Sequence, residues 1–523
     1  MQRKIWVNGD YINWEDAQVH ILSHSHQRGS LIFGFIPIFE NNGVISLFRL
    51  NDHVERLFTS CEAAQIPLEY SSQDIQLAIK DTVRKNPGSK FVKISVYIAS
   101  IEIDVVPQGG NTSLCGAATP DETGKSIIIS LEKMNNVRAF NKEAQTITVD
   151  SGIILSKIHE IVEEQNLFFP LSLGAQGSCM IGGNLSTNAG GVNVLKYGNT
   201  RELCLGLEIV LPDGKIMNLL SELKKDNTGY DLKNLFIGAE GTLGIITAAT
   251  LKLFQLPKMI TTLFVESDKI SNAIKLLNVF TSHFPDRIES FELMPKSFWD
   301  IAKNNIDNIV MPLEKTPEMG ILIDISSFSE NEIIPDKNGQ IPIIDTIENV
   351  LETCLESSLI SDATICKNES QKKSIWSIRE AGAESEKKEL QKSKLIKCLK
   401  HDISLPVASI ENFHKDAQKM ITNFLPNLKT IYFGHLGDGN LHYNVFGNGS
   451  LPDGFEGKSL ELTDKLYEIV NKYNGSFSAE HGVGQLKKKS LEKHKDSVAY
   501  SLMKTIKKEL DPKCIMNPGK VLF

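Results

Sequence analysis

Two short stretches near the end of the chain carry residues that could bind a metal ion. Residues 435–442 read HLGDGNLH, so His435 and His442 bracket the turn sequence GDGN. The surrounding sequence, IYFGHLGDGNLHYNVF, places apolar runs on both sides of that turn and predicts a β-hairpin. Such a hairpin would hold the two histidines at facing strand ends, where they could bind a divalent metal, most often zinc. The alternative is a pair of surface histidines beside an ordinary turn.

A third metal ligand is needed, and SAEHGVG at residues 478–484 offers Glu480 and His481. Three protein ligands leave one position open, as in catalytic rather than structural zinc sites. A histidine next to a ligand could then take a proton from a bound group.

Glycine-rich segments earlier in the chain could hold a second kind of ligand. VVPQGGNTSLCGA (105–117) follows a strand, and its consecutive N–H groups from Gly109 to Ser113 could curl around a diphosphate. A tight turn would explain the same residues. LGAQGSCMIGGNLSTNAGG (173–191) holds six glycines and could line a planar ligand, although a linker is the alternative. FIGAEGTLGIIT (236–247) and NPGK (517–520) are two further clusters.

The composition limits the class of protein. The chain has 523 residues, 41% hydrophobic and 23% charged, which indicates two to four globular domains. A formal net charge of −8 makes non-specific nucleic-acid binding unfavourable. Eight cysteines without a CxxC pair disfavour a cysteine zinc site, an iron–sulfur cluster or a disulfide framework, and favour a reducing compartment. No secretory signal or membrane-spanning run is evident.

The elements that must position these residues change in character along the chain. Residues 105–257 read as short strands separated by glycine-rich loops. Residues 258–430 alternate strands with amphipathic helices, which predicts an antiparallel sheet with helices on one face. KKKSLEKHKDSVAYSLMKTIKKELDP, near the C-terminus, predicts one long helix ended by Pro512.

The order of the four glycine clusters resembles FAD-binding oxidoreductases of the vanillyl-alcohol-oxidase type, in the branch with D-2-hydroxyglutarate and D-lactate dehydrogenases. The resemblance covers residues 105–523 and implies dissociable FAD, because no histidine for covalent attachment is evident in these loops. It implies that the pyrophosphate lies against Gln108, Gly109, Gly110, Asn111, Thr112 and Ser113. The flavin would be lined by Gly174, Ser178, Cys179, Gly182, Gly183, Asn184, Thr187 and Asn188. Glu240, Gly244 and Ile245 would lie near the adenosine end, and Asn517 and Lys520 would close the site.

The same resemblance assigns the second site. The motifs GHxGDGNxH and AEHGxG imply that His435, His442 and Glu480 bind zinc or another divalent metal and that His481 is the catalytic base. Asn444 would contact substrate, and Arg379 and Lys400 would grip its carboxylate. Where the hydroxyglutarate enzymes have threonine one turn after that arginine, this chain has Ala383, so D-lactate or another D-2-hydroxy acid competes as substrate.

Residues 1–104 resemble a different family, the small domain of fold-type-IV, pyridoxal-phosphate-dependent aminotransferases. The matching stretches are WVNGDYINWEDAQVHILSHSHQRGSLIF and FRLNDHVERL, in which Arg56 would contact the cofactor phosphate. The family's Schiff-base lysine lies beyond the segment that matches, so transamination is not expected. The first βα unit of the FAD-binding domain is missing from the flavoprotein part, and this fragment stands in its place.

The sequence therefore predicts an α+β protein of four parts. These are an aminotransferase-like fragment (1–104), an N-terminally truncated FAD-binding domain (105–257), a cap domain with an antiparallel sheet and the metal site (258–478), and a closing segment (479–523). The predicted activity is FAD-dependent oxidation of a D-2-hydroxy acid. An aminotransferase and an inactive fusion remnant are the alternatives. Expected partners are the hydroxy acid and an electron acceptor (an electron-transfer flavoprotein, a quinone or a cytochrome), with a homodimer as one option. The expected location is the cytoplasm or the periphery of the inner membrane.

Overall fold

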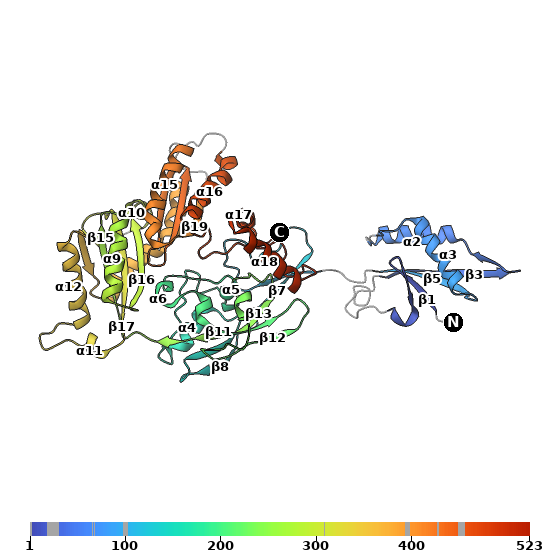
Figure 1. Cartoon of the computed structure of the whole chain (residues 1–523), viewed down its shortest axis with the longest axis horizontal. Coiled ribbons are helices and arrows are strands. Elements are labelled where there is room, and N and C mark those ends of the chain that lie inside the picture. The colour runs from blue at the N-terminus through green and yellow to red at the C-terminus, as the bar shows by residue number, and fades with distance from the viewer. Residues whose placement is uncertain are drawn as a thin grey trace. The chain divides into compact units, whose positions relative to one another are not determined.

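The computed structural model describes residues 3–17, 31–64, 66, 68–97, 103–307, 309–392, 398–425, 428–447 and 455–522. The chain divides into two compact units, Met1–Ile103 and Asp104–Phe523 (Figure 1). Part of the aminotransferase-like stretch, residues 18–30, lies outside the described residues.

The first unit is a small α+β domain. The hairpin of β1 (Lys4–Val7) and β2 (Asp10–Asn13) is followed by a short 3-10 turn, Trp14–Asp16. A sheet of order β4-β3-β5, formed by β3 (Leu31–Asn41), β4 (Val44–Leu47) and β5 (Phe91–Tyr97), packs against α2 (Leu50–Ala63) and α3 (Ser72–Lys85). Its other face leaves Phe33, Phe35 and Phe91 at least half exposed.

The second unit begins with the glycine-rich part. Strands β6 (Asp104–Gln108) and β7 (Ser126–Ser130) form a parallel pair, and the first glycine cluster follows β6 as predicted. An antiparallel sheet of order β12-β11-β13-β9-β8 comes next. Its strands are β8 (Val137–Asn141), β9 (Thr146–Asp150), β11 (Cys204–Val210), β12 (Ile216–Asn218) and β13 (Ile245–Lys252).

Short helices and a two-stranded antiparallel sheet, formed by β10 (Leu167–Phe168) and β14 (Phe254–Gln255), complete this part. The helices are α4 (Leu155–Glu163), α5 (Ile181–Ser186), α6 (Val194–Tyr197), α7 (Thr200–Leu203) and α8 (Lys233–Phe236). Among the described residues β7 is paired in a sheet only with β6, and its Ile127 and Ile128 are each 48% exposed.

The cap is built on a seven-stranded antiparallel sheet of order β18-β15-β17-β16-β20-β21-β19. Its strands are β15 (Met259–Ser267), β16 (Ile288–Pro295), β17 (Met319–Ser327), β18 (Asp362–Ile365), β19 (Cys398–Ser404), β20 (Leu428–His435) and β21 (Asn440–Gly447). The connecting helices are α9 (Ile270–His283), α10 (Lys296–Asn305), α11 (Glu330–Ile333), α12 (Pro342–Glu356), α13 (Glu369–Glu380), α14 (Gly382–Lys392), a 3-10 turn (Val407–Ser409), α15 (Ile410–Phe424) and α16 (Phe455–Lys472).

Helices cover both faces of this sheet, so the prediction of a single helical face is wrong. On β15, Leu263 and Val265 pack in one core with α9, α12, α15 and α16, whereas Phe264 packs in another core with α10 and α13. Successive strand residues point to opposite faces, and here both faces are apolar. Sequence alternation alone could not show this, because a strand buried on both faces has no polar side.

The chain then returns to the glycine-rich part. The predicted single C-terminal helix is two, α17 (Lys488–His494) and α18 (Ser497–Leu510), because the Asp496 side chain accepts a hydrogen bond from the Ala499 N–H and starts a new helix. Beyond α18, the Val105 N–H donates to the Ile515 carbonyl at 2.7 Å, which joins the C-terminal segment to β6. Within the described residues, no helix is long and apolar enough to cross a membrane.

Candidate functional site

The predicted hairpin forms, and its two histidines lie close to Glu480, which comes from a separate loop. Strands β20 and β21 pair antiparallel, with Phe433 opposite His442. One ligand atom from each of His435, His442 and Glu480 lies within 4.8 Å of the others. Two imidazoles and a carboxylate are the donors that zinc takes in catalytic sites, so these residues fit a divalent ion.

A buried carboxylate that the sequence analysis did not single out supports this cluster. Glu292 of β16 lies opposite His435 in the sheet and is fully buried. Its Oε1 is 2.5 Å from His435 Nδ1, and its Oε2 accepts a hydrogen bond from Arg379 Nε at 2.7 Å. With Nδ1 engaged by Glu292, the other ring nitrogen of His435 faces Glu480, whose Oε1 is 3.4 Å away. The only sequence signal was a glutamate inside the apolar strand IESFELMP.

The charges of Glu292, Arg379 and His435 strongly affect one another. Burial opposes ionisation of Glu292, but the neighbouring Arg379 and His435 lower its pKa to about 2. Burial also opposes protonation of His435, yet Glu292 and Glu480 raise its pKa to about 10. Without a metal, the cluster therefore holds a proton on His435, and an incoming cation would displace that proton.

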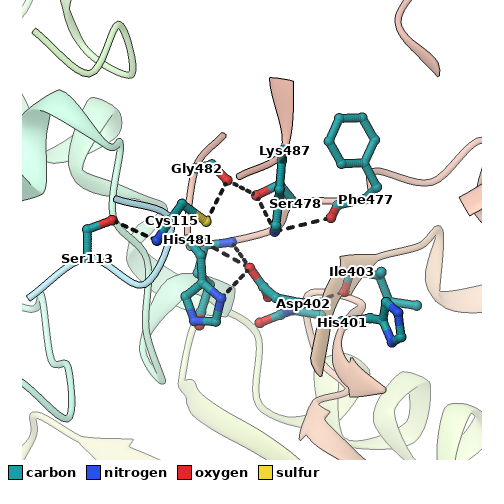
Figure 2. A network of polar contacts seen from close by, with 12 residues as sticks. Ser113, Cys115, His401, Asp402, Ile403, Phe477, Ser478, His481, Gly482 and Lys487 are labelled. Carbon is teal, nitrogen blue, oxygen red and sulfur yellow. Dashed lines mark hydrogen bonds and ion pairs between the residues drawn. The ribbon is translucent and has the colours of Figure 1, made fainter. Parts of the chain in front are cut away.

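A second overlooked carboxylate, Asp402 of β19, holds the loop that carries Glu480 and His481. Asp402 is buried, and its Oδ2 accepts hydrogen bonds from the backbone N–H groups of Glu480 (2.8 Å) and His481 (3.0 Å). The same oxygen lies 3.4 Å from His481 Nδ1 (Figure 2). Burial opposes ionisation of Asp402, but His481 and His442 lower its pKa to about 2. Asp402 thus orients the His481 ring.

The glycine-rich part holds the same loop from the opposite side. The two oxygens of Glu240 each accept one backbone hydrogen bond, from Val483 and Gly484, both at 2.7 Å. Burial raises the pKa of Glu240. The Cys115 thiol donates to the Gly482 carbonyl at 3.4 Å (Figure 2). The loop is therefore held at two places: Asp402 of the cap binds the backbone of Glu480 and His481, and Glu240 of the glycine-rich part binds the backbone of Val483 and Gly484.

A cavity of about 390 Å³ is lined by residues of the glycine clusters and by Glu480 and His481. Many of the expected cofactor residues line it: Gly109, Gly110, Asn111, Thr112, Ser113, Gly174, Cys179, Gly182, Gly183, Asn184, Thr187, Glu240, Gly244 and Ile245. Five others are not part of this lining: Gln108, Ser178, Asn188, Asn517 and Lys520.

Two details of the cavity wall suit a bound cofactor. A side chain at Gly110 would put its Cβ 2.0 Å from the Ser178 carbonyl oxygen, whereas Gly183 faces open space. The glycines thus allow two loops to touch and also leave room for a ligand. The buried Oδ1 of Asn184, in the cavity wall, has no hydrogen-bond partner among the described atoms, so a ligand donor would satisfy it.

Three of the expected residues outside the lining, Gln108, Asn188 and Asn517, make hydrogen bonds that hold the loops of the wall. Gln108 donates to the Ala118 carbonyl at 2.7 Å, and Asn188 accepts from the Arg201 N–H at 3.0 Å. Asn517 donates to the carbonyls of Ala117 (2.9 Å) and Glu240 (2.6 Å). Asn517 therefore ties the C-terminal segment to two cavity loops.

The residues expected to grip a carboxylate already have acidic partners. Arg379 is buried, with its guanidinium 5.1 Å from the Phe433 ring, and its bond to Glu292 uses one of its five N–H donors. Lys400 pairs with Glu386 at 3.1 Å. Asn444 donates to the other oxygen of Glu386 at 2.5 Å. Glu386 lies on α14 and was not identified from sequence.

Comparison with known proteins identifies the family. Residues 256–521 match the family described as FAD linked oxidases, C-terminal domain, and residues 89–220 match the FAD binding domain family. The chain belongs to the FAD-linked oxidases. It is 36% identical over 428 residues to a mitochondrial D-2-hydroxyglutarate dehydrogenase of Danio rerio, covering 82% of this chain and 75% of the relative. It is 35% identical over 465 residues to a putative mitochondrial D-lactate dehydrogenase of Schizosaccharomyces pombe, covering 85% and 81%.

Solved structures confirm the fold. Alkyldihydroxyacetonephosphate synthase superposes with a TM-score of 0.56 at 16% identity, covering 80% of this chain and 72% of that one. p-Cresol methylhydroxylase superposes with a TM-score of 0.58 at 12% identity, covering 80% and 84%. The expected vanillyl-alcohol-oxidase-type architecture is therefore present in this FAD-linked oxidase. The FAD binding domain match begins at residue 89, inside the first compact unit.

Proposed function

We propose that this FAD-linked oxidase oxidises a D-2-hydroxy acid to the 2-oxo acid. The observation that carries the proposal is the convergence of His435, His442 and Glu480, together with the position of Glu480 and His481 in the wall of the glycine-lined cavity. The glycine-lined cavity can hold a cofactor, and its wall also carries His481, the proposed base, and Glu480, one of the three proposed metal ligands. The names of the relatives, D-2-hydroxyglutarate and D-lactate dehydrogenases, support the same substrate class.

The proposed roles follow from the contacts. His481 takes the proton of the substrate's 2-hydroxyl, and Asp402 holds the imidazole and stabilises its charged form. Arg379 binds the C1 carboxylate through N–H donors other than the Nε that Glu292 engages. When bound, the FAD supplies the hydride acceptor and the metal supplies a Lewis acid that lowers the pKa of the hydroxyl. His435, His442 and Glu480 would hold the metal, and the cavity glycines the FAD.

The remaining parts of the proposal concern partners and location. The electrons leave to a separate acceptor, which is an electron-transfer flavoprotein, a quinone or a cytochrome. We place the protein in the cytoplasm, although the Danio rerio relative is named as mitochondrial. The first unit is proposed to be an aminotransferase-like fragment without transaminase activity, and a homodimer stays among the options.

Anaerobic mixing of the purified flavoprotein with D- and L-2-hydroxy acids tests the proposal. Only the D-acids should bleach the flavin absorbance, and acid precipitation should release the flavin into the supernatant. His481→Ala should keep flavin and metal while slowing bleaching by roughly 10²–10⁴-fold, the usual contribution of a general base. Protein that carries flavin and metal but does not react with any D-2-hydroxy acid would refute the proposal.

A further inference from the structure

Building on the proposed function, we infer that Glu386 sets the substrate class. The preferred acid is a D-2-hydroxy monocarboxylate with an uncharged alkyl side chain, of which D-lactate is the simplest example. A dicarboxylate such as D-2-hydroxyglutarate is disfavoured.

The register of the cap sheet shows where a substrate side chain would lie. Strands β19 and β21 pair Asp402 with His442 and Lys400 with Asn444. Residues two apart along a strand point to the same face, separated by roughly 7 Å. Lys400 and Asn444 are therefore the next polar side chains along the sheet face that carries His442. A substrate whose C2 lies at the metal cluster would extend its longer substituents toward them.

Glu386 occupies the far end of that path. It lies on α14, one helical turn after Gly382. The start of this helix packs tightly against the sheet, because a Cβ atom added at Gly382 would lie 2.9 Å from the Phe298 ring and 3.2 Å from the Phe433 ring. Its side chain is only 3% exposed, with Oε1 accepting from Asn444 Nδ2 at 2.5 Å and Oε2 lying 3.1 Å from Lys400 Nζ. Both polar side chains beyond His442 are thus engaged by one carboxylate.

The charges at this position work against a second substrate carboxylate. The positive charge of Lys400, which could bind such a group, is already balanced by Glu386. A distal carboxylate would also approach the buried Glu386 carboxylate, and like charges in contact are unfavourable. The neighbouring position on the same helix turn, Ala383, offers a methyl group and no hydrogen-bond donor. An uncharged alkyl substituent would not be repelled by Glu386 and would need no cation or hydrogen-bond donor.

The experiment compares kcat/KM for D-lactate and D-2-hydroxyglutarate, measured with an artificial electron-acceptor dye. The wild-type enzyme should favour D-lactate. Glu386→Gln removes the charge but keeps the size and one acceptor oxygen, so the ratio should shift toward D-2-hydroxyglutarate by about tenfold, equivalent to about 1.4 kcal/mol. The matched control is Glu384→Gln on the same helix, where the exposed Glu384 pairs with Lys388, and it should leave the ratio unchanged.

The outcomes separate this inference from the proposed function. A wild-type preference for D-2-hydroxyglutarate, or an unchanged ratio in a folded Glu386→Gln enzyme, would overturn the role of Glu386 while the dehydrogenase activity stood. The wild-type preference is informative even when the variant does not fold. Failure of both acids to bleach the flavin would remove the proposed function and this inference together.

Discussion

Replacing Glu240 by Gln tests whether the loop bearing Glu480 and His481 must be held from both sides. Each oxygen of Glu240 accepts one backbone hydrogen bond from this loop, at 2.7 Å from Val483 and from Gly484. A glutamine has one acceptor oxygen, so its NH₂ group would face the second backbone N–H. Glu240 is buried, and its hydrogen bond to the Gly484 N–H is buried as well.

The expected cost follows from that unpaired donor. Leaving one buried N–H unsatisfied costs about 1–3 kcal/mol, and a cost near 2 kcal/mol corresponds to about a 30-fold change in a rate or equilibrium. Asp402 still holds the first half of the loop, so the loop should loosen and not detach. We expect the rate of flavin reduction at saturating D-acid to fall about 10- to 100-fold, with a much smaller change in KM.

Stopped-flow bleaching of the flavin measures this rate, and flavin and metal contents are measured on the same samples. Glu208→Gln is the control, because Glu208 pairs with Arg138 and Thr247 elsewhere in the same part of the fold. Because burial raises the pKa of Glu240, acidification should also slow the wild-type enzyme toward the rate of the variant. A wild-type rate in Glu240→Gln, or a loss fully explained by missing flavin, would refute the reasoning.

The remaining predictions concern the metal cluster, the base and acid stability. His442→Ala should lower metal content and turnover but leave flavin bound, as elemental analysis and flavin absorbance would show. A wild-type enzyme that is active without metal and insensitive to chelators would contradict this prediction. Asp402→Asn should slow flavin reduction at unchanged flavin content, because the amide cannot stabilise a charged His481; equal rates across the pH range would exclude this role. Burial lowers the pKa of His401 and of His414 to about 4. The unfolded chain therefore binds protons first, and each histidine should remove about 1.4 kcal/mol of stability per pH unit as pH falls from about 6.5 to 4. His414→Gln should reduce that slope in urea unfolding.

The features that local sequence could specify were predicted correctly. GDGN between two apolar runs produced the β20–β21 hairpin, because turn chemistry and alternation both act over a few residues. The glycine cluster after β6 and the strand after residue 244 also formed where expected. Family motifs named the ligand set whose atoms the fold brings within 4.8 Å, although their role stays a prediction.

Tertiary structure decided which carboxylates support the site. Four of their hydrogen bonds, Glu292–His435, Asp402–Glu480, Glu240–Gly484 and Glu386–Asn444, join residues that lie 58 to 244 positions apart along the chain. Sequence shows a glutamate in an apolar strand or a helix, but not which distant backbone or side chain it will meet. The register of the cap sheet sets two of the pairings at the site: Glu292 lies opposite His435, and Lys400 lies opposite Asn444. Long-range packing also buried both faces of the cap sheet, because helices from distant segments cover each face. The alternation of polar and apolar residues along a strand could not predict this second helical layer. Local chemistry thus determined the turns and the ligand types, while strand pairing determined the charges around them.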